Sequence, residues 1–156
     1  MKSTITTNKL LTLLKVLIAI IILSGCNSTK EALAISEKEK SAFDAVEGDP
    51  VTIADEETEY EIIIIDPGFY TWLNTIARPE GYYSKTFLEN RNRLLVLNWN
   101  QRVLAPNNYD PSLYEMQIDY QPSIDYGYEV NYKLYNYFIY FQRRYKERLG
   151  PFVPRI

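Results

Sequence analysis

Residues 127–149 read GYEVNYKLYNYFIYFQRRYKERL, a densely aromatic stretch that Gly150-Pro151 ends. Its apolar residues form two neighbouring stripes at helical spacing. The first stripe contains Val130, Leu134, Tyr137, Phe138, Phe141 and Tyr145, and the second contains Tyr128, Tyr132, Tyr135 and Ile139. The remaining side carries mainly Glu129, Lys133, Asn136, Arg143, Arg144 and Glu147. We therefore predict a tyrosine-rich helix that occupies the centre of the fold.

Two stretches upstream favour β-structure. Residues 60–66 read YEIIIID, and four consecutive isoleucines without polar alternation are typical of a strand buried on both faces. Residues 114–120 alternate well enough to form a second strand, which we expect to pair with the first. This pairing predicts a small sheet of two or more strands.

Two further helices are indicated by their capping residues. Asp66 precedes Pro67 as an N-cap precedes proline at the first helical position, and apolar residues follow at helical spacing up to Ile76. Ser84 is placed to cap a longer helix that reaches about Leu104. Together these signals predict an α+β domain at residues 60–156, with about three helices around the small sheet.

The predicted helix after Ser84 has basic and polar residues within its apolar face. Arg91, Asn98 and Arg102 lie among leucine and phenylalanine side chains on a helical projection. Arginine is rarely buried without a partner. Either these arginines form an internal ion pair, or their face lines a ligand pocket. The candidate acidic partners are Asp66, Asp119 and Asp125.

The N-terminal segment has the layout of a signal peptide. Residues 1–15 carry three lysines and no acid, and residues 16–23 are a continuous apolar run that is too short to span a membrane. The following Leu23-Ser24-Gly25-Cys26 resembles the bacterial lipobox, which implies cleavage after residue 25 and a diacylglycerol on Cys26. Asn27 follows the cysteine, and this favours the outer membrane under the common sorting rule. We expect a lipid-anchored protein of the cell envelope.

Residues 26–59 are predicted to be a mostly flexible acidic tether. The segment 30–61 contains eleven acidic residues and three lysines, a net charge of −8, whereas residues 62–156 carry a net charge of +2. No basic stripe is present, so we expect no nucleic-acid partner. The expected membrane contact is the lipid anchor itself, together with a possible protein partner in the envelope.

The residue inventory restricts the chemistry. The chain has no histidine and a single cysteine, which excludes histidine-assisted nucleophiles and His/Cys zinc sites. A pair drawn from Asp119, Asp125 and Glu115 could act as the acid and base of a glycan hydrolase. Ten of the fourteen tyrosines lie between Tyr109 and Tyr145, and they suit a core, a protein interface or sugar stacking. We expect no cofactor, no metal site and no catalytic residue.

Several short segments resemble a family of small bacterial lipoproteins with a domain of unknown function, over about residues 60–145. They are IIIDPGF at 63–69 with Trp72-Leu73, ENRNR at 89–93, Trp99-Asn100, Ile118-Asp119-Tyr120, IDYG at 124–127 and NYKLY at 131–135. The resemblance implies no particular activity. We therefore expect a non-enzymatic interaction or structural module. The alternatives are a module that binds an envelope glycan or a small ligand and, third, a carboxylate-based hydrolase. The candidate ligand-binding residues are Arg91, Arg102, Asp119 and Asp125.

Overall fold

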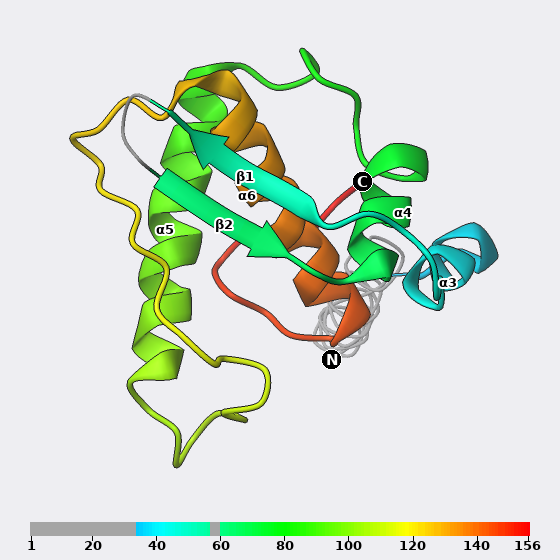
Figure 1. Cartoon of the computed structure of the whole chain (residues 1–156). Helices are drawn as coiled ribbons and strands as arrows, with labels where there is room; N and C mark the ends of the chain where they lie inside the picture. The colour runs from blue at the N-terminus through cyan, green and yellow to red at the C-terminus, as the bar shows by residue number, and fades with distance from the viewer. Residues whose placement is uncertain (1–33, 57–59) are drawn as a thin grey trace, which may run out of the picture. The chain divides into compact units, whose positions relative to one another are not determined.

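A computed structural model describes residues 34–56 and 60–156, and residues Ile35–Ile156 form one compact unit. Its elements in chain order are α3 (Glu37–Phe43), β1 (Val51–Asp55), β2 (Tyr60–Ile64), α4 (Pro67–Thr75), α5 (Lys85–Val103) and α6 (Gly127–Arg144) (Figure 1). The described residues thus contain four helices and a two-stranded antiparallel sheet. The predicted α+β class is confirmed.

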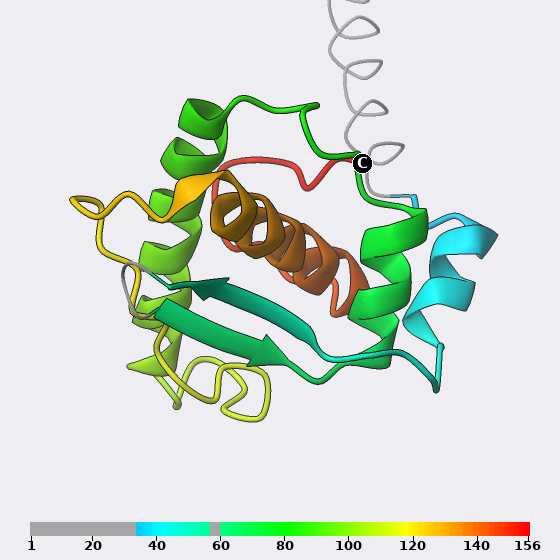
Figure 2. The same ribbon diagram turned by 45° about the horizontal axis from the view of Figure 1, so that its top comes forward.

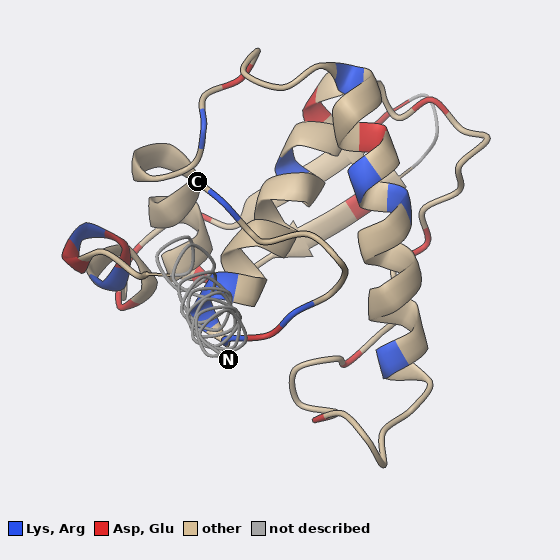
Figure 3. Ribbon diagram, turned by 180° about the vertical axis from the view of Figure 1, so that it is seen from behind, with Lys and Arg blue, Asp and Glu red and all other residues tan. Residues whose placement is uncertain are grey.

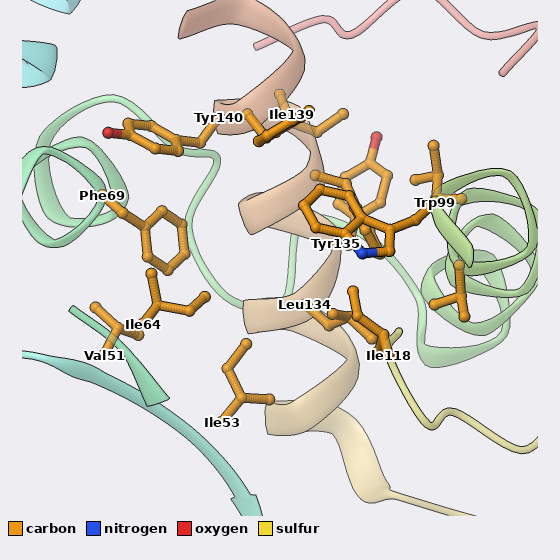
Figure 4. Close-up of a cluster of buried hydrophobic side chains, with 14 of the residues drawn as sticks. Val51, Ile53, Ile64, Phe69, Trp99, Ile118, Leu134, Tyr135, Ile139 and Tyr140 are labelled. Carbon is orange, nitrogen blue, oxygen red and sulfur yellow. The ribbon is translucent and has the colours of Figure 1, made fainter. Parts of the chain in front are cut away.

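Helix α6 lies at the centre of this unit. Helix α5 flanks it on one side, α4 on the other, and the β1–β2 hairpin crosses a third side (Figure 2). The segment after α6 runs back along the remaining side (Figure 2). Leu134, Phe138 and Tyr140 are completely buried. Side chains from the sheet and α4 surround α6 on one flank, and Trp99 and Ile118 lie on the other (Figure 4). The central tyrosine-rich helix is confirmed.

The helix is more enclosed than its sequence indicates and ends earlier. Arg143 and Asn136, which belong to the predicted polar side, are both 3% exposed. The helix ends at Arg144 because the backbone reverses at Lys146, whose φ is +56°. The chain then returns to bury Leu149, whose amide donates to Gln142 Oε1 at 2.9 Å. The predicted extension of the helix to residue 149 is therefore wrong.

The two predicted N-caps are confirmed. Asp66 Oδ1 accepts a hydrogen bond from the Gly68 amide at 2.9 Å at the start of α4. Ser84 Oγ accepts one from the Phe87 amide at 3.2 Å at the start of α5. Gly68 is also required sterically, because a Cβ there would lie 2.7 Å from the Phe43 carbonyl oxygen and from the Tyr140 hydroxyl. Tyr140 of α6 can approach α4 closely for this reason.

The sheet differs from the prediction in its partner strand. Strand β2 pairs with β1, and in this register Ile62 lies opposite Ile53. Ile64 faces the core, whereas Ile63 and Ile65 are 53% and 78% exposed. The predicted pairing of residues 60–66 with 114–120, and the predicted burial on both faces, are wrong. The hairpin has one core face and one solvent face, as antiparallel sheets commonly have.

Residues assigned to the tether form part of the compact unit. Ile53 of β1 is fully buried, and so is Glu39 of α3. The Glu39 carboxylate lies against the Arg143 guanidinium, with Nε–Oε1 and Nη2–Oε2 distances of 2.5 and 2.6 Å. The structure therefore places the start of the globular unit at Ile35, not at residue 60. The predicted signal peptide and Cys26 lie outside the described residues.

Candidate functional site

A groove of about 690 Å³ separates strand β2 from the segment 112–119. One wall consists of residues 60–66, and the other consists of Ser112, Leu113 and residues 115–119. Trp99 of α5 and four aromatic residues of the C-terminal region line it between these walls. The four are Tyr137, Tyr140, Phe141 and Tyr145. In Figure 1 the second wall is part of the yellow chain that runs beside β2 in front of α5. The volume lies in the ordinary range of ligand-binding pockets.

The second wall is attached to α5 instead of to the sheet. The Asn100 side chain accepts a hydrogen bond from the Ile118 amide at 2.8 Å and donates one to the Ile118 carbonyl at 2.9 Å. Trp99 Nε1 also donates to the Met116 carbonyl at 2.9 Å. Asn100 thus satisfies the two backbone groups that a neighbouring strand would have paired. This is why residues 114–120 do not form the predicted strand.

The edge of β2 that faces the groove has no strand partner within residues 34–56 and 60–156. The two-stranded sheet pairs β2 with β1 alone, and no described backbone hydrogen bond joins residues 60–65 to 112–119. In an antiparallel pair, alternate residues direct their N–H and C=O groups away from the partner strand. The groove therefore presents a row of backbone donors and acceptors along one wall.

The floor of the groove is aromatic, and contacts with neighbouring side chains hold its rings in place. Trp99 packs edge-on against Phe141, with ring centroids 4.8 Å apart. The Tyr140 hydroxyl donates to Asp66 Oδ2 at 2.7 Å, and this bond links the floor to the end of the first wall. Burial raises the pKa of Tyr137, so its phenol stays neutral at ordinary pH. The floor offers flat apolar surface with a few hydroxyl groups.

The charges that line the groove are all negative. The four carboxylates among the lining residues are Glu61, Asp66, Glu115 and Asp119, and the lining contains no lysine or arginine. Basic residues lie on α3, α5 and α6, after α4 and in the C-terminal segment, whereas the charged residues of the chain between α5 and α6 are all acidic (Figure 3). Exposed apolar residues accompany these carboxylates, since Met116 is 69% exposed on one wall and Ile63 is half-exposed on the other. The groove therefore suits a ligand that is partly apolar and positively charged.

One polar group in the groove lacks a partner within the described residues. The Tyr60 hydroxyl is buried without a hydrogen bond. Its ring packs on Tyr126, with centroids 4.6 Å apart, so the hydroxyl is fixed in place. Burial also raises the pKa of Tyr60, so this hydroxyl remains a donor. It is therefore a buried donor without a described acceptor at the start of β2.

The hydroxyl group in the second wall is not arranged for nucleophilic catalysis. Ser112 Oγ donates to Asp110 Oδ1 at 2.7 Å, and the Ser112 amide donates to the same oxygen at 2.9 Å. These bonds hold the pKa of Asp110 below its usual value, which makes this carboxylate a weak proton acceptor. The pair forms an Asx-type turn typical of loops.

Of the predicted carboxylate pairs, the two that include Asp125 are not brought together in the groove. Asp119 lines the groove, whereas Asp125 does not. Asp125 instead contacts Lys85 Nζ at 2.6 and 2.7 Å and accepts a bond from the Gly127 amide at 2.9 Å. The hydrogen bond with Lys85 lowers the pKa of Asp125, and the Gly127 amide adds to the effect. Asp125 is thus occupied at the start of α6. Glu115 and Asp119 are the two members of the predicted set that share the groove.

The two predicted arginines have different surroundings. Arg102 forms the ion pair that the sequence suggested, but with Glu147, at 2.5 Å, and not with an aspartate. It also donates to the Tyr114 hydroxyl and to the Arg148 carbonyl. Arg91 instead lies on two aromatic rings, 3.4 Å from the Phe152 centroid and 5.0 Å from that of Phe87. Neither arginine lines the groove.

The groove itself was not predicted, although the sequence contains a signal for it. Residues 41–77 and 103–132 contain fourteen acidic residues and no lysine or arginine. These two stretches supply both walls. The acidic excess of residues 30–61 on its own resembles a tether, and the groove is indicated only when the second acidic stretch is compared with it.

Comparison with known proteins gives the family. A family profile described as a family of unknown function, DUF6146, matches residues 12–152. The chain belongs to DUF6146. Searches of the curated proteins and of the solved structures gave no significant match. The DUF6146 match extends beyond residues 60–145, which contain the short segments that resemble the family, and it includes α3 and β1.

The expected lipid attachment site, Cys26, lies outside the described part of this DUF6146 chain, so its lipidation stays a prediction. Within residues 34–56 and 60–156, no helix has the length and hydropathy needed to cross a bilayer. The same residues contain no cluster of three or more acidic side chains placed to hold a metal ion.

Proposed function

We propose that this DUF6146 protein is a lipid-anchored, non-enzymatic interaction module of the cell envelope. In this proposal it holds an extended, basic segment of a partner protein in the groove beside β2. The observation that carries the proposal is the combination of an unpaired strand edge and an acidic lining that contains no basic residue. The anchor rests on Cys26, which follows Leu23-Ser24-Gly25 in the lipobox arrangement.

An extended segment fits the walls because β2 offers backbone groups at strand spacing. A peptide that adds to a sheet edge gains main-chain hydrogen bonds, and its alternate side chains point to opposite faces. One set of side chains would lie on the aromatic floor formed by Tyr137 and Phe141.

Charge complementarity supports a basic partner segment. Glu61 projects from the first wall, and Glu115 and Asp119 project from the second. All three are exposed, so each ion pair contributes little alone, about 0–1 kcal/mol. Their combined field still favours lysine or arginine and disfavours acidic segments. Binding should therefore weaken as the ionic strength rises.

The experiment uses the full chain in nonionic detergent and a fluorescent peptide of alternating lysine and valine. We expect saturable binding by fluorescence anisotropy. The matching glutamate–valine peptide should bind at least about tenfold more weakly because the groove is acidic. A lysine–proline peptide, which lacks half of the amide donors, should also bind weakly if backbone pairing contributes.

Charge-reversal variants test whether the groove, rather than the overall negative charge of the protein, binds the lysine–valine peptide. The double variant Glu61→Lys, Glu115→Lys reverses charge on both walls and should lower the affinity about tenfold or more. Glu80→Lys is the matched control, because Glu80 is exposed and does not line the groove. Equal binding of the two charged peptides, or an unchanged affinity in the double variant, would overturn the groove assignment. In cells, Cys26→Ser should move the protein out of the membrane fraction, and retention of the variant there would overturn the anchor.

A further inference from the structure

A second site lies away from the groove, at Arg91. This residue is half-buried on α5, and its guanidinium stacks on Phe152 and Phe87. Within residues 34–56 and 60–156, Arg91 makes no hydrogen bond and no ion pair. The expected internal ion pair is therefore not formed. The two faces of a stacked guanidinium contact the rings, whereas its N–H donors lie in the plane and point outward from its edge. Arg91 is thus held in place with its hydrogen-bonding capacity unused.

Arg91 lines a cavity of about 390 Å³. Its walls include Tyr83, Phe87, Tyr135 and Phe152, and a second arginine, Arg155, also lines it. The aromatic walls are rigid, since the Tyr83 and Phe87 rings stack with centroids 4.7 Å apart and Tyr135 packs edge-on against both. No acidic residue is among the lining residues. The walls of the cavity are therefore largely apolar, and its charged groups, Arg91 and Arg155, are both positive.

We propose that this cavity binds a small organic carboxylate that has a flat apolar body. The planar edge of Arg91 matches the two oxygens of a carboxylate, and Arg155 supplies a second positive charge. The aromatic walls would cover the apolar body, and the volume lies at the small end of the range of ligand pockets. The site shares no lining residue with the β2 groove, so it is independent of the proposed peptide binding.

The test uses the full chain in nonionic detergent and calorimetric titration with N-acetylphenylalanine. Its amide, N-acetylphenylalaninamide, has the same apolar body without the charge. We expect the acid to bind and the amide to bind at least about tenfold more weakly. Inorganic phosphate should bind more weakly than the acid, because it has no body to fill the aromatic walls. Equal affinity for acid and amide, a preference for phosphate, or no binding of the acid up to ~10 mM would overturn the proposal.

Two variants assign the binding to Arg91. Arg91→Met keeps an unbranched apolar side chain on the rings but removes the donors, and it should lower the affinity for the acid about tenfold or more. Arg93→Met is the control, since Arg93 is exposed on the same helix and donates to the Pro122 carbonyl outside the cavity. An equal loss of affinity in both variants, or no loss in Arg91→Met, would contradict the assignment. The comparison of acid with amide uses wild-type protein, so it stands even if a variant is unstable.

Discussion

Arg143 joins three distant parts of the chain through one guanidinium. Two of its nitrogens bind the Glu39 carboxylate of α3, and Nη1 donates to the Pro154 carbonyl at 3.0 Å. Glu39 also accepts a bond from Trp72 Nε1 of α4 at 3.1 Å. Both charged groups are almost completely buried, with exposures of 0% and 3%. A buried ion pair is costly to form, but removal of one partner leaves an uncompensated charge in the core.

At this residue scale we predict that Glu39→Gln destabilises the protein by about 3–5 kcal/mol, because it leaves the Arg143 charge buried. The matched control is Glu37→Gln in the same helix, since Glu37 is 88% exposed and pairs with Lys40 at the surface. The Glu37 variant should change the free energy of unfolding by less than about 1 kcal/mol. Urea unfolding of the full chain, followed by circular dichroism, measures both values. Similar stabilities of the two variants would show that the buried pair contributes nothing specific.

At the scale of elements, local signals were predictable and distant partners were not. Asp66 and Ser84 cap residues two or three positions away, so their sequence context alone indicates where α4 and α5 begin. The alternation of residues 114–120 was misleading, because Asn100 of α5 takes the place of a strand. No pattern in the sequence shows which amide side chain will meet Ile118. The position of the groove has the same origin, since it exists where the expected strand pairing does not form, whereas the acidic character of its walls is visible in the sequence.

Asn100 therefore controls the second wall of the groove. We predict that Asn100→Ala lowers the free energy of unfolding by about 1–3 kcal/mol, because it leaves the Ile118 amide and carbonyl without their described partner. Asn98→Ala is the control, since Asn98 donates to the Leu94 carbonyl within α5. This variant should change the free energy of unfolding by less than about 0.5 kcal/mol. Hydrogen exchange should also become faster at the Ile118 amide in the Asn100 variant alone. Unchanged exchange at Ile118 would show that another contact holds this wall.

At the scale of the whole molecule, the tyrosines couple stability to alkaline pH. Burial raises the pKa of Tyr120 to about 12. Burial also raises the pKa of Tyr60, Tyr114, Tyr135, Tyr137 and Tyr140 above its ordinary value. These phenols are neutral in the folded state, whereas in the unfolded chain they ionise near pH 10. Above that pH the unfolded state binds fewer protons than the folded state, so stability falls as the pH rises.

We predict that the fold is stable up to about pH 10 and is lost between about pH 10 and pH 12. The rise in tyrosinate absorbance from these buried phenols should then coincide with the loss of far-ultraviolet circular dichroism. In concentrated denaturant all fourteen tyrosines should titrate together near pH 10. A single titration near pH 10 in the native protein, with the fold intact, would contradict the described burial.

The position of Glu39 has a consequence for the order of folding during synthesis. Its partner Arg143 lies 104 residues later in the chain, so the carboxylate has no counter-charge to join until that residue has left the ribosome. Helix α3 can pack on α4, which carries Trp72, before α6 is made, but its buried carboxylate stays without its counter-charge until α6 is available. The closing of so long a loop is slow. The ion pair between α3 and α6 is therefore a late contact in the assembly of the core.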